Sequence, residues 1–205
     1  AMFMAFQGSN PIIHPGEGQM QLPNLIANSH VLFLDKKASS SGKVKPPMAG
    51  ELLDYYTAEQ LRAHFLGLGL GIRSVSFQPK PLNPKANERD GDPALKEGNL
   101  LTNVLNRLAR SCFYTSQQYY DGKVPVGQVS EAVLQEARDT ILEYERLMYK
   151  YEFHNVMNLM DTYIRNANKY WVSGMKEVKD TDNMDLQAQI VVDAFHMLRT
   201  SIVLM

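Results

Sequence analysis

The second half of this chain carries apolar residues at every third or fourth position in four separate segments. These segments cover residues 93–118, 129–149, 152–172 and 183–204. Because an α-helix has about 3.6 residues per turn, this spacing places the apolar side chains of each segment on one face. Four such helices with short connections can bury these faces against one another. The pattern therefore predicts an antiparallel helix bundle over residues 93–205.

The apolar face of each segment predicts which of its residues lie in the bundle core. In the first two segments the apolar face consists of Leu101, Val104, Leu105, Leu108, Cys112, Val133, Ala137, Ile141, Tyr144 and Met148. In the last two it consists of Phe153, Val156, Met157, Met160, Ile164, Leu186, Ile190, Ala194 and Met197. From these we expect buried side chains at Leu101, Val104, Leu105, Leu108 and Ile141.

The first part of the chain predicts a small α/β unit instead. The elements expected there are strands near 24–27, 31–34 and 72–77 and helices over 50–56 and 58–67. The second helix has Thr57 as its N-cap, with Gln60 placed to complete a capping box. The runs of strand residues are short and are broken by Pro, Gly and Asn.

Three regions follow from these patterns. Residues 1–77 form the α/β unit, and residues 78–92 are a linker rich in Pro, Asn and charged residues. Residues 93–205 form the helical domain, which opens with Asp92 as N-cap and Pro93 in the first helical position. The fold class is therefore mainly α, with a helix bundle preceded by a small α/β piece.

Composition excludes several classes of protein. The net charge of −1 gives no general attraction for nucleic acid, and residues 93–205 hold 12 Lys and Arg residues against 14 Asp and Glu residues. Any RNA contact would need a local basic surface. The single cysteine, Cys112, excludes an intrachain disulfide and is typical of a reducing compartment. We find no apolar run of membrane-spanning length, so the sequence predicts a soluble, cytoplasmic protein.

Three motifs occur in order along the chain. They read Lys37-Ala38-Ser39-Ser40-Ser41, Leu61-Arg62-Ala63-His64-Phe65-Leu66 and Asn103-Val104-Leu105-Asn106-Arg107. In this order and at these distances they resemble class I aminoacyl-tRNA synthetases, most closely the methionyl-tRNA synthetases. The family has Lys-Met-Ser-Lys-Ser, Asp-x-Leu-Arg-Tyr-Tyr-Leu and Gly-Asn-Leu-x-x-Arg. The likeness runs over most of residues 22–200.

The resemblance implies an ATP site in the first motif. Its residues would be Lys37, Ser39 and Ser41, with Mg²⁺ accompanying the nucleotide in the whole enzyme. A Gly- and Ser-rich loop with a lysine can surround a phosphate with N–H, hydroxyl and ammonium groups. Ser40 stands where the family has its second lysine, which removes one cation from the loop. A solvated loop that no longer binds ATP is the alternative interpretation.

The resemblance also implies a tRNA contact in the third motif. Asn103 and Arg107 lie four residues apart and off the apolar face, so both leave the same exposed side of the helix. In the family, an Asn and an Arg at these positions read anticodon bases; ordinary surface polarity is the alternative. The family's stacking Trp is replaced by Glu177, whose carboxylate would repel RNA. Trp171 is expected in the core or in an interface.

The sequence thus predicts the C-terminal part of a methionyl-tRNA synthetase-like protein. The whole enzyme would activate methionine with ATP and transfer it to tRNA. The His-x-Gly-His motif of the family does not occur in this chain, so no catalytic set is complete here. A degenerate paralogue that serves as a non-catalytic interaction module is the second hypothesis. We expect no metal site, because His64, His154 and His196 are isolated on helices.

Overall fold

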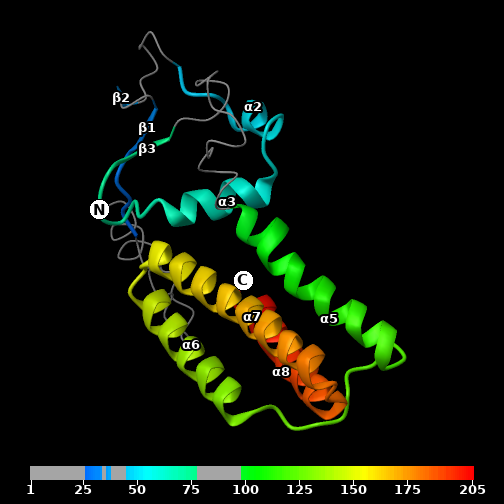
Figure 1. The fold of residues 1–205 in the computed structure, drawn as a ribbon. Helices are drawn as coiled ribbons and strands as arrows, with labels where there is room; N and C mark the ends of the chain where they lie inside the picture. The colour runs from blue at the N-terminus through cyan, green and yellow to red at the C-terminus, as the bar shows by residue number, and fades with distance from the viewer. Residues whose placement is uncertain (1–25, 34–35, 38–44, 78–97) are drawn as a thin grey trace, which may run out of the picture.

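The computed structural model describes residues 26–33, 36–37, 45–77 and 98–205. Within these ranges the protein is mainly helical, with a small sheet near one end (Figure 1). The predicted fold class is therefore confirmed at the level of a mainly α protein. The expected linker over residues 78–92 and the N-cap at Asp92 lie outside the described residues.

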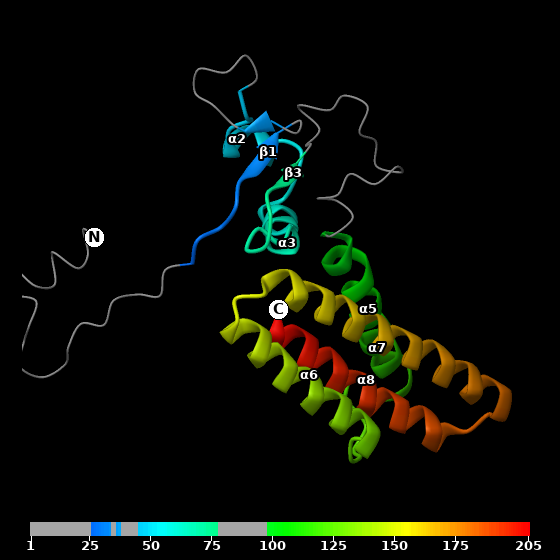
Figure 2. The ribbon, with the colours of Figure 1, turned by 90° about the vertical axis from the view of Figure 1, so that its left-hand side faces the viewer.

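Four long helical segments make up the second half. The first begins with a π-helical segment, η2 (Leu100–Leu105), and continues as α5 (Asn106–Tyr119). The others are α6 (Glu131–Tyr149), α7 (Phe153–Thr181) and α8 (Met184–Leu204). Successive helices run in opposite directions (Figure 1, Figure 2), and residues 98–205 contain no strand.

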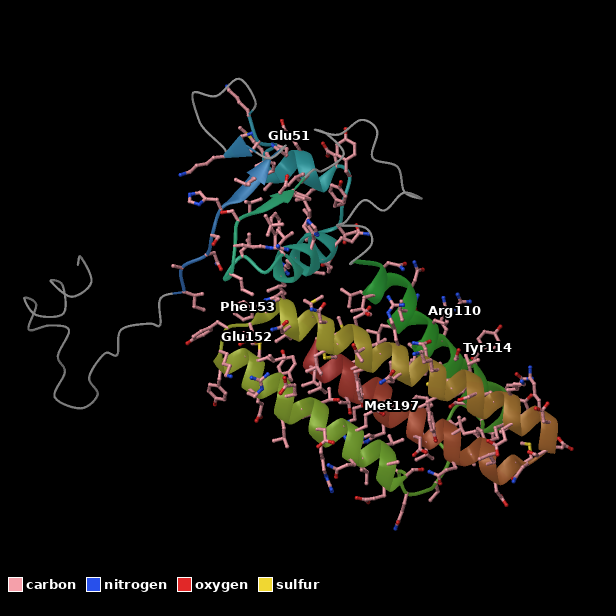
Figure 3. The ribbon with its side chains drawn as sticks, turned by 60° about the vertical axis from the view of Figure 1, so that its left-hand side comes forward. Glu51, Arg110, Tyr114, Glu152, Phe153 and Met197 are labelled. Atoms are coloured by element: carbon pink, nitrogen blue, oxygen red, sulfur yellow. The ribbon has the colours of Figure 1, made fainter. Side chains whose placement is uncertain are left out.

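The centre of the bundle is α8, which is buried on most of its circumference. Its Val191, Ala194 and Met197 pack in one apolar cluster with Leu108 and Cys112 of α5. Figure 3 shows Met197 in the interior, between the helices. Trp171 of α7 belongs to the same cluster and is only 9% exposed, which confirms the core position expected for it.

The predicted core is wrong from the middle of α6 onward. Val133 and Ala137 are buried as expected, but Ile141 is 39% exposed, and Thr140 and Leu147 are buried instead. Two successive steps of four residues turn a side chain by about 80° around the helix, because each residue advances it by about 100°. Ile141 therefore points away from the neighbours of Val133, and the buried face follows alternating steps of three and four.

The third helix is longer than predicted. We expected it to end near residue 172, before Ser173 and Gly174, but α7 continues to Thr181. A Cβ built on Gly174 would lie 2.6 Å from Cδ1 of Ile190 on α8. The glycine therefore allows close approach of two helices and does not terminate one.

The first part contains a three-stranded sheet and two short helices. The strands are β1 (Val31–Phe33), β2 (Lys36–Lys37) and β3 (Val75–Phe77), in the order β2-β1-β3. β1 pairs with β2 in antiparallel fashion and with β3 in parallel. Residues 26 and 27 form no strand, so the strand expected there is not observed in that part.

The two helices are α2 (Ala49–Leu53) and α3 (Ala58–Gly67). The capping box predicted for the second is confirmed. Gln60 N–H donates to Thr57 Oγ1 at 3.2 Å, and Thr57 N–H donates to Gln60 Oε1 at 2.9 Å. These bonds satisfy backbone donors that the first turn leaves without partners.

The α/β part sits on the bundle through α3, which lies across the ends where the first and third bundle helices begin (Figure 1, Figure 2). Two glycines allow this approach. A Cβ on Gly98 would lie 2.5 Å from Cγ of Gln60, and one on Gly69 would lie 3.3 Å from Cγ of His154. The start of η2 is therefore held close to α3.

Candidate functional site on the first bundle helix

The first bundle helix begins with π-helical turns, which are rare and are often found at functional sites. A π-turn is wider than an α-turn, so it changes which side chains face the core. Leu100 is buried here, whereas Leu101, expected in the core, is half-buried. Leu105 is also half-buried, whereas Val104, Leu108 and Cys112 of the apolar face expected on this helix are buried.

A neighbouring helix stabilises this irregular segment. The side-chain amide of Asn168 on α7 donates to the carbonyl oxygen of Val104 at 3.0 Å and also to that of Ile164 at 3.0 Å. A backbone carbonyl in a helix that departs from α-geometry needs a partner, because a buried acceptor without one is costly. Asn168 supplies that partner from outside the helix.

The outer side of η2 and α5 carries a hollow of about 520 Å³. We call this surface the α5 face; its described lining residues are Asn99, Asn103, Asn106, Arg107, Arg110, Ser111 and Tyr114. The two residues predicted to contact tRNA, Asn103 and Arg107, thus lie together at one hollow, and both side chains are exposed.

Most residues of the α5 face were missed from the sequence. The motif predicts only Asn103 and Arg107, and it does not include Asn99, Asn106, Arg110, Ser111 or Tyr114. A signal for them exists, because polar residues recur three or four positions apart on the side opposite Leu108. The apolar periodicity that predicts the core therefore also predicts this polar row.

The α5 face is basic within a slightly acidic domain. Residues 98–120 contain no Asp or Glu, whereas α6 holds five acidic residues and two arginines. Neither Arg107 nor Arg110 forms an ion pair with any residue that the structure describes. By contrast, Arg165 on α7 binds Asp161 at 2.8 Å, and Arg146 on α6 binds Glu143. The two guanidinium groups of the α5 face are available to an external anion.

The remaining side chains of the α5 face offer hydrogen bonds and an aromatic surface. The Asn103 amide donates to the side-chain oxygen of Asn99, which holds the two carboxamides together. Arg110 and Tyr114 project outward from α5, away from the other helices (Figure 3). Guanidinium groups bind phosphate, carboxamides pair with base edges, and an exposed ring can stack on a base. This set of groups is suited to RNA.

The predicted ATP residues are only partly described. Lys37, expected in a loop, is exposed and lies in the short strand β2. Ser39 and Ser41 lie outside the described residues, as does Ser40. Glu177, which stands at the position of the family's stacking Trp, is exposed on α7.

A second hollow, of about 250 Å³, lies where α3 meets the start of α7. Its described lining includes Phe65, Leu66, Tyr151, Phe153 and His154, and none of its described lining residues is Asp, Glu, Lys or Arg. Figure 3 places Phe153 at this corner, below the α/β part. The hollow offers apolar contact but few polar groups that could orient a ligand.

The buried carboxylate of Asp193 links the connection before α6 to α7 and α8. Asp193 on α8 is fully buried and accepts hydrogen bonds from the Ser130 N–H and hydroxyl, at 2.8 and 2.6 Å. It also accepts from the Tyr170 hydroxyl at 2.6 Å and from Gln189 Nε2 at 3.1 Å. Burial, and then the bond to Asp193, raises the pKa of Tyr170 above its ordinary value. These donors all come from the protein itself, which indicates a structural role.

Among the residues that the structure describes, no three His, Cys, Asp or Glu side chains come together as metal ligands would. No described helix combines the length and the apolar character needed to cross a bilayer.

Comparison with known proteins identifies no family for this chain. Neither models of known protein families nor curated protein sequences give a significant match. Support for a function therefore comes from the chemistry of the residues, and the α5 face is the part of the described structure with the most specific chemistry.

Proposed function

We propose that this chain is the RNA-binding part of a methionyl-tRNA synthetase-like protein, and that the α5 face contacts tRNA. The observation that supports this most is the pair of arginines, without an ion pair among the described residues, beside exposed carboxamides on a helix face without acidic residues. In the proposed whole enzyme, methionine is activated with ATP and then transferred to tRNA. The bundle is the anticodon-binding type of domain in this proposal.

The charge distribution explains how a slightly acidic domain could bind RNA. Attraction at short range depends on local charge, because exposed charges more than about 8 Å apart are largely screened at physiological salt. Arg107 and Arg110 are three residues apart on one side of α5, whereas the acidic residues concentrate on α6. An RNA strand lying along the α5 face would meet the arginines before the carboxylates.

The ATP part of the proposal rests on the resemblance of Lys37, Ser39 and Ser41 to the family's loop. The alternative is a non-catalytic interaction module, which Ser40 and Glu177 favour. Both forms of the proposal keep the bundle as the part that binds a partner. They differ in whether that partner is RNA.

Binding of a fluorescently labelled methionine tRNA transcript to the full chain tests the proposal. We would measure anisotropy at several salt concentrations for wild type, Asn103→Ala and Arg107→Ala. Loss of one phosphate contact in Arg107→Ala should weaken binding and flatten the log–log salt dependence by about one unit. Asn103→Ala removes no charge, so it should weaken binding about fivefold, as loss of one hydrogen bond does, and leave the slope unchanged.

Arg138→Ala is the matched control, because it removes an exposed arginine from α6 with its many carboxylates. It should change neither the affinity nor the slope. If wild type does not bind the transcript even at low salt, the RNA proposal is wrong and the interaction module is favoured. Equal effects of Arg138→Ala and Arg107→Ala would show that binding is not located on the α5 face.

A further inference from the structure

The large aromatic side chain of Tyr114 is exposed to solvent. Its side chain is 71% exposed, although a tyrosine ring on a helix can usually cover apolar surface nearby. It forms no hydrogen bond and no ring contact within the part of the chain that the structure describes. The preceding residue behaves differently, since Phe113 packs edge to face against Phe195 with ring centroids 5.5 Å apart. The Tyr114 ring therefore lies on the surface and stacks on no aromatic ring of the described residues.

The ring stands in line with the two unpaired arginines. Arg107, Arg110 and Tyr114 follow one another at three and four residues, a spacing that places them on one side of an α-helix. Tyr114 lies about 6 Å along the helix axis from Arg110, given a rise of about 1.5 Å per residue. Figure 3 shows Arg110 and Tyr114 leaving α5 on the same outward side. All three line the same hollow.

From this arrangement we infer that Arg110 and Tyr114 form a subsite for one unpaired nucleotide of RNA, with the base stacked on the Tyr114 ring and its phosphate held by Arg110 and Arg107. This inference rests on the proposed function and adds which residues hold the nucleotide and what kind of RNA they accept. Within a nucleotide, one sugar separates phosphate from base, so both groups can reach side chains one helical turn apart.

The chemistry favours unpaired over duplex RNA. In a duplex, both faces of each base inside the helix are covered by neighbouring base pairs, so a protein ring has no face on which to stack except at the duplex ends. An unpaired base in a loop or at a strand end offers its face, and stacking on an aromatic side chain tolerates any base. Arginine contacts to phosphate are available in both kinds of RNA. Tyr114 is therefore the residue that should discriminate between them.

We would measure anisotropy of the full chain with a labelled short single-stranded RNA and with the duplex formed from that strand. Wild type should bind the single strand more tightly than the duplex. Tyr114→Ala should weaken single-strand binding about tenfold, in line with the loss of one stacked base, and leave the salt slope and the duplex affinity unchanged. Tyr114→Phe keeps the ring and should bind as wild type does. Arg110→Ala should weaken both complexes and flatten both salt slopes.

Tyr149→Ala is the control, because Tyr149 is an 85% exposed tyrosine on α6, away from the hollow. It should alter neither complex. If wild type binds the single strand but Tyr114→Ala binds it as well as Tyr149→Ala does, the nucleotide subsite is wrong while RNA binding stands. Equal affinity of wild type for single strand and duplex would also overturn the subsite. If wild type binds neither RNA, the proposed function fails together with the inference.

Discussion

At the scale of single residues, this protein buries two groups of opposite character in one bundle. Asp193 is surrounded by donors from Ser130, Tyr170 and Gln189, which stabilise its carboxylate. Cys112 is fully buried among apolar side chains that offer no such partners. Burial therefore raises the pKa of the Cys112 thiol to about 12. A buried thiol with so high a pKa should be inert as a nucleophile.

The raised pKa of Cys112 predicts a loss of stability at alkaline pH. The folded protein keeps the thiol proton, while the unfolded chain loses it above about pH 9, so the unfolded state binds fewer protons there. The free energy of unfolding should be unaffected by this group below pH 8 and should fall by about 1 kcal/mol between pH 9 and 10. Urea unfolding with a reducing agent present measures this fall.

Cys112→Ala should be less stable than wild type at neutral pH, and the difference should narrow above pH 9 because the variant shows a shallower decline. Tyrosines such as Tyr170 and Tyr163, whose pKa values burial also raises, would add their own losses only above about pH 10. An unchanged decline in Cys112→Ala would mean that other groups account for it.

At the scale of secondary structure elements, the apolar periodicity predicts where the helices lie. It predicts less well which side chains are buried and where the longest helix ends. α6 and α8 begin and end within about two residues of the expected bounds, which is the usual uncertainty in placing helix ends. The stripe on α6 fails at Ile141, since steps of four residues drift around the helix. α7 extends past Gly174, where the helix lies close against Ile190 of α8.

The contact at Gly174 predicts a coupling between α7 and α8. Alanine there gains about 1 kcal/mol of helix propensity, but its Cβ would collide with Cδ1 and Cγ1 of the buried Ile190. Overpacking of this kind costs about 1–3 kcal/mol, so Gly174→Ala should destabilise the protein by roughly 1 kcal/mol. Ile190→Val removes the Cδ1 atom and should cost about 1 kcal/mol by itself.

The double variant separates the collision from the two single effects. If the two side chains collide, Gly174→Ala with Ile190→Val should cost less than the sum of the single costs, by at least about 0.5 kcal/mol. The free energy of unfolding of all four proteins, measured in urea, gives this difference. Additive costs would show that Ile190 moves aside without strain.

At the scale of the whole molecule, the α/β part and the bundle meet through α3 (Figure 2). Gly69 lies beside His154 at this junction and has a φ of 68°, which disfavours any side chain. Gly122, in the connection between α5 and α6, has a φ of 75° but no atom near its missing Cβ. Gly69 and Gly122 have the same backbone conformation, but Gly69 lies at the contact between the α/β part and the bundle and Gly122 does not.

This pair predicts how much the junction contributes to stability. Gly122→Ala should cost about 1–2 kcal/mol from backbone conformation alone. Gly69→Ala should cost more, because its methyl group also meets the His154 ring at 3.3 Å. The His154→Ala variant lacks the ring. In that variant, the cost of Gly69→Ala should therefore fall close to the cost of Gly122→Ala. Thermal unfolding, followed by circular dichroism, would measure these costs; equal costs for the two single glycine variants would contradict a close-packed junction.

The sequence by itself determined the features that depend on neighbours along the chain. The apolar spacing of the four segments, the Thr57–Gln60 capping box and the placement of Asn103 and Arg107 on one exposed side all depend on residues no more than one or two turns apart. Such interactions are repeated from one turn to the next, so a linear pattern contains them.

Tertiary structure decided the features that depend on atoms far apart in sequence. The π-turns of η2 are supported by Asn168, which is 64 residues away from its partner Val104. The close approach of α7 and α8 at Gly174 involves Ile190, and the exposure of Ile141 depends on which face of α6 meets its neighbours. The α5 face combines both origins, because helical spacing aligns its polar row while no element of the described structure packs over that row. Tertiary packing therefore determines which of the helix faces allowed by the sequence periodicity is buried.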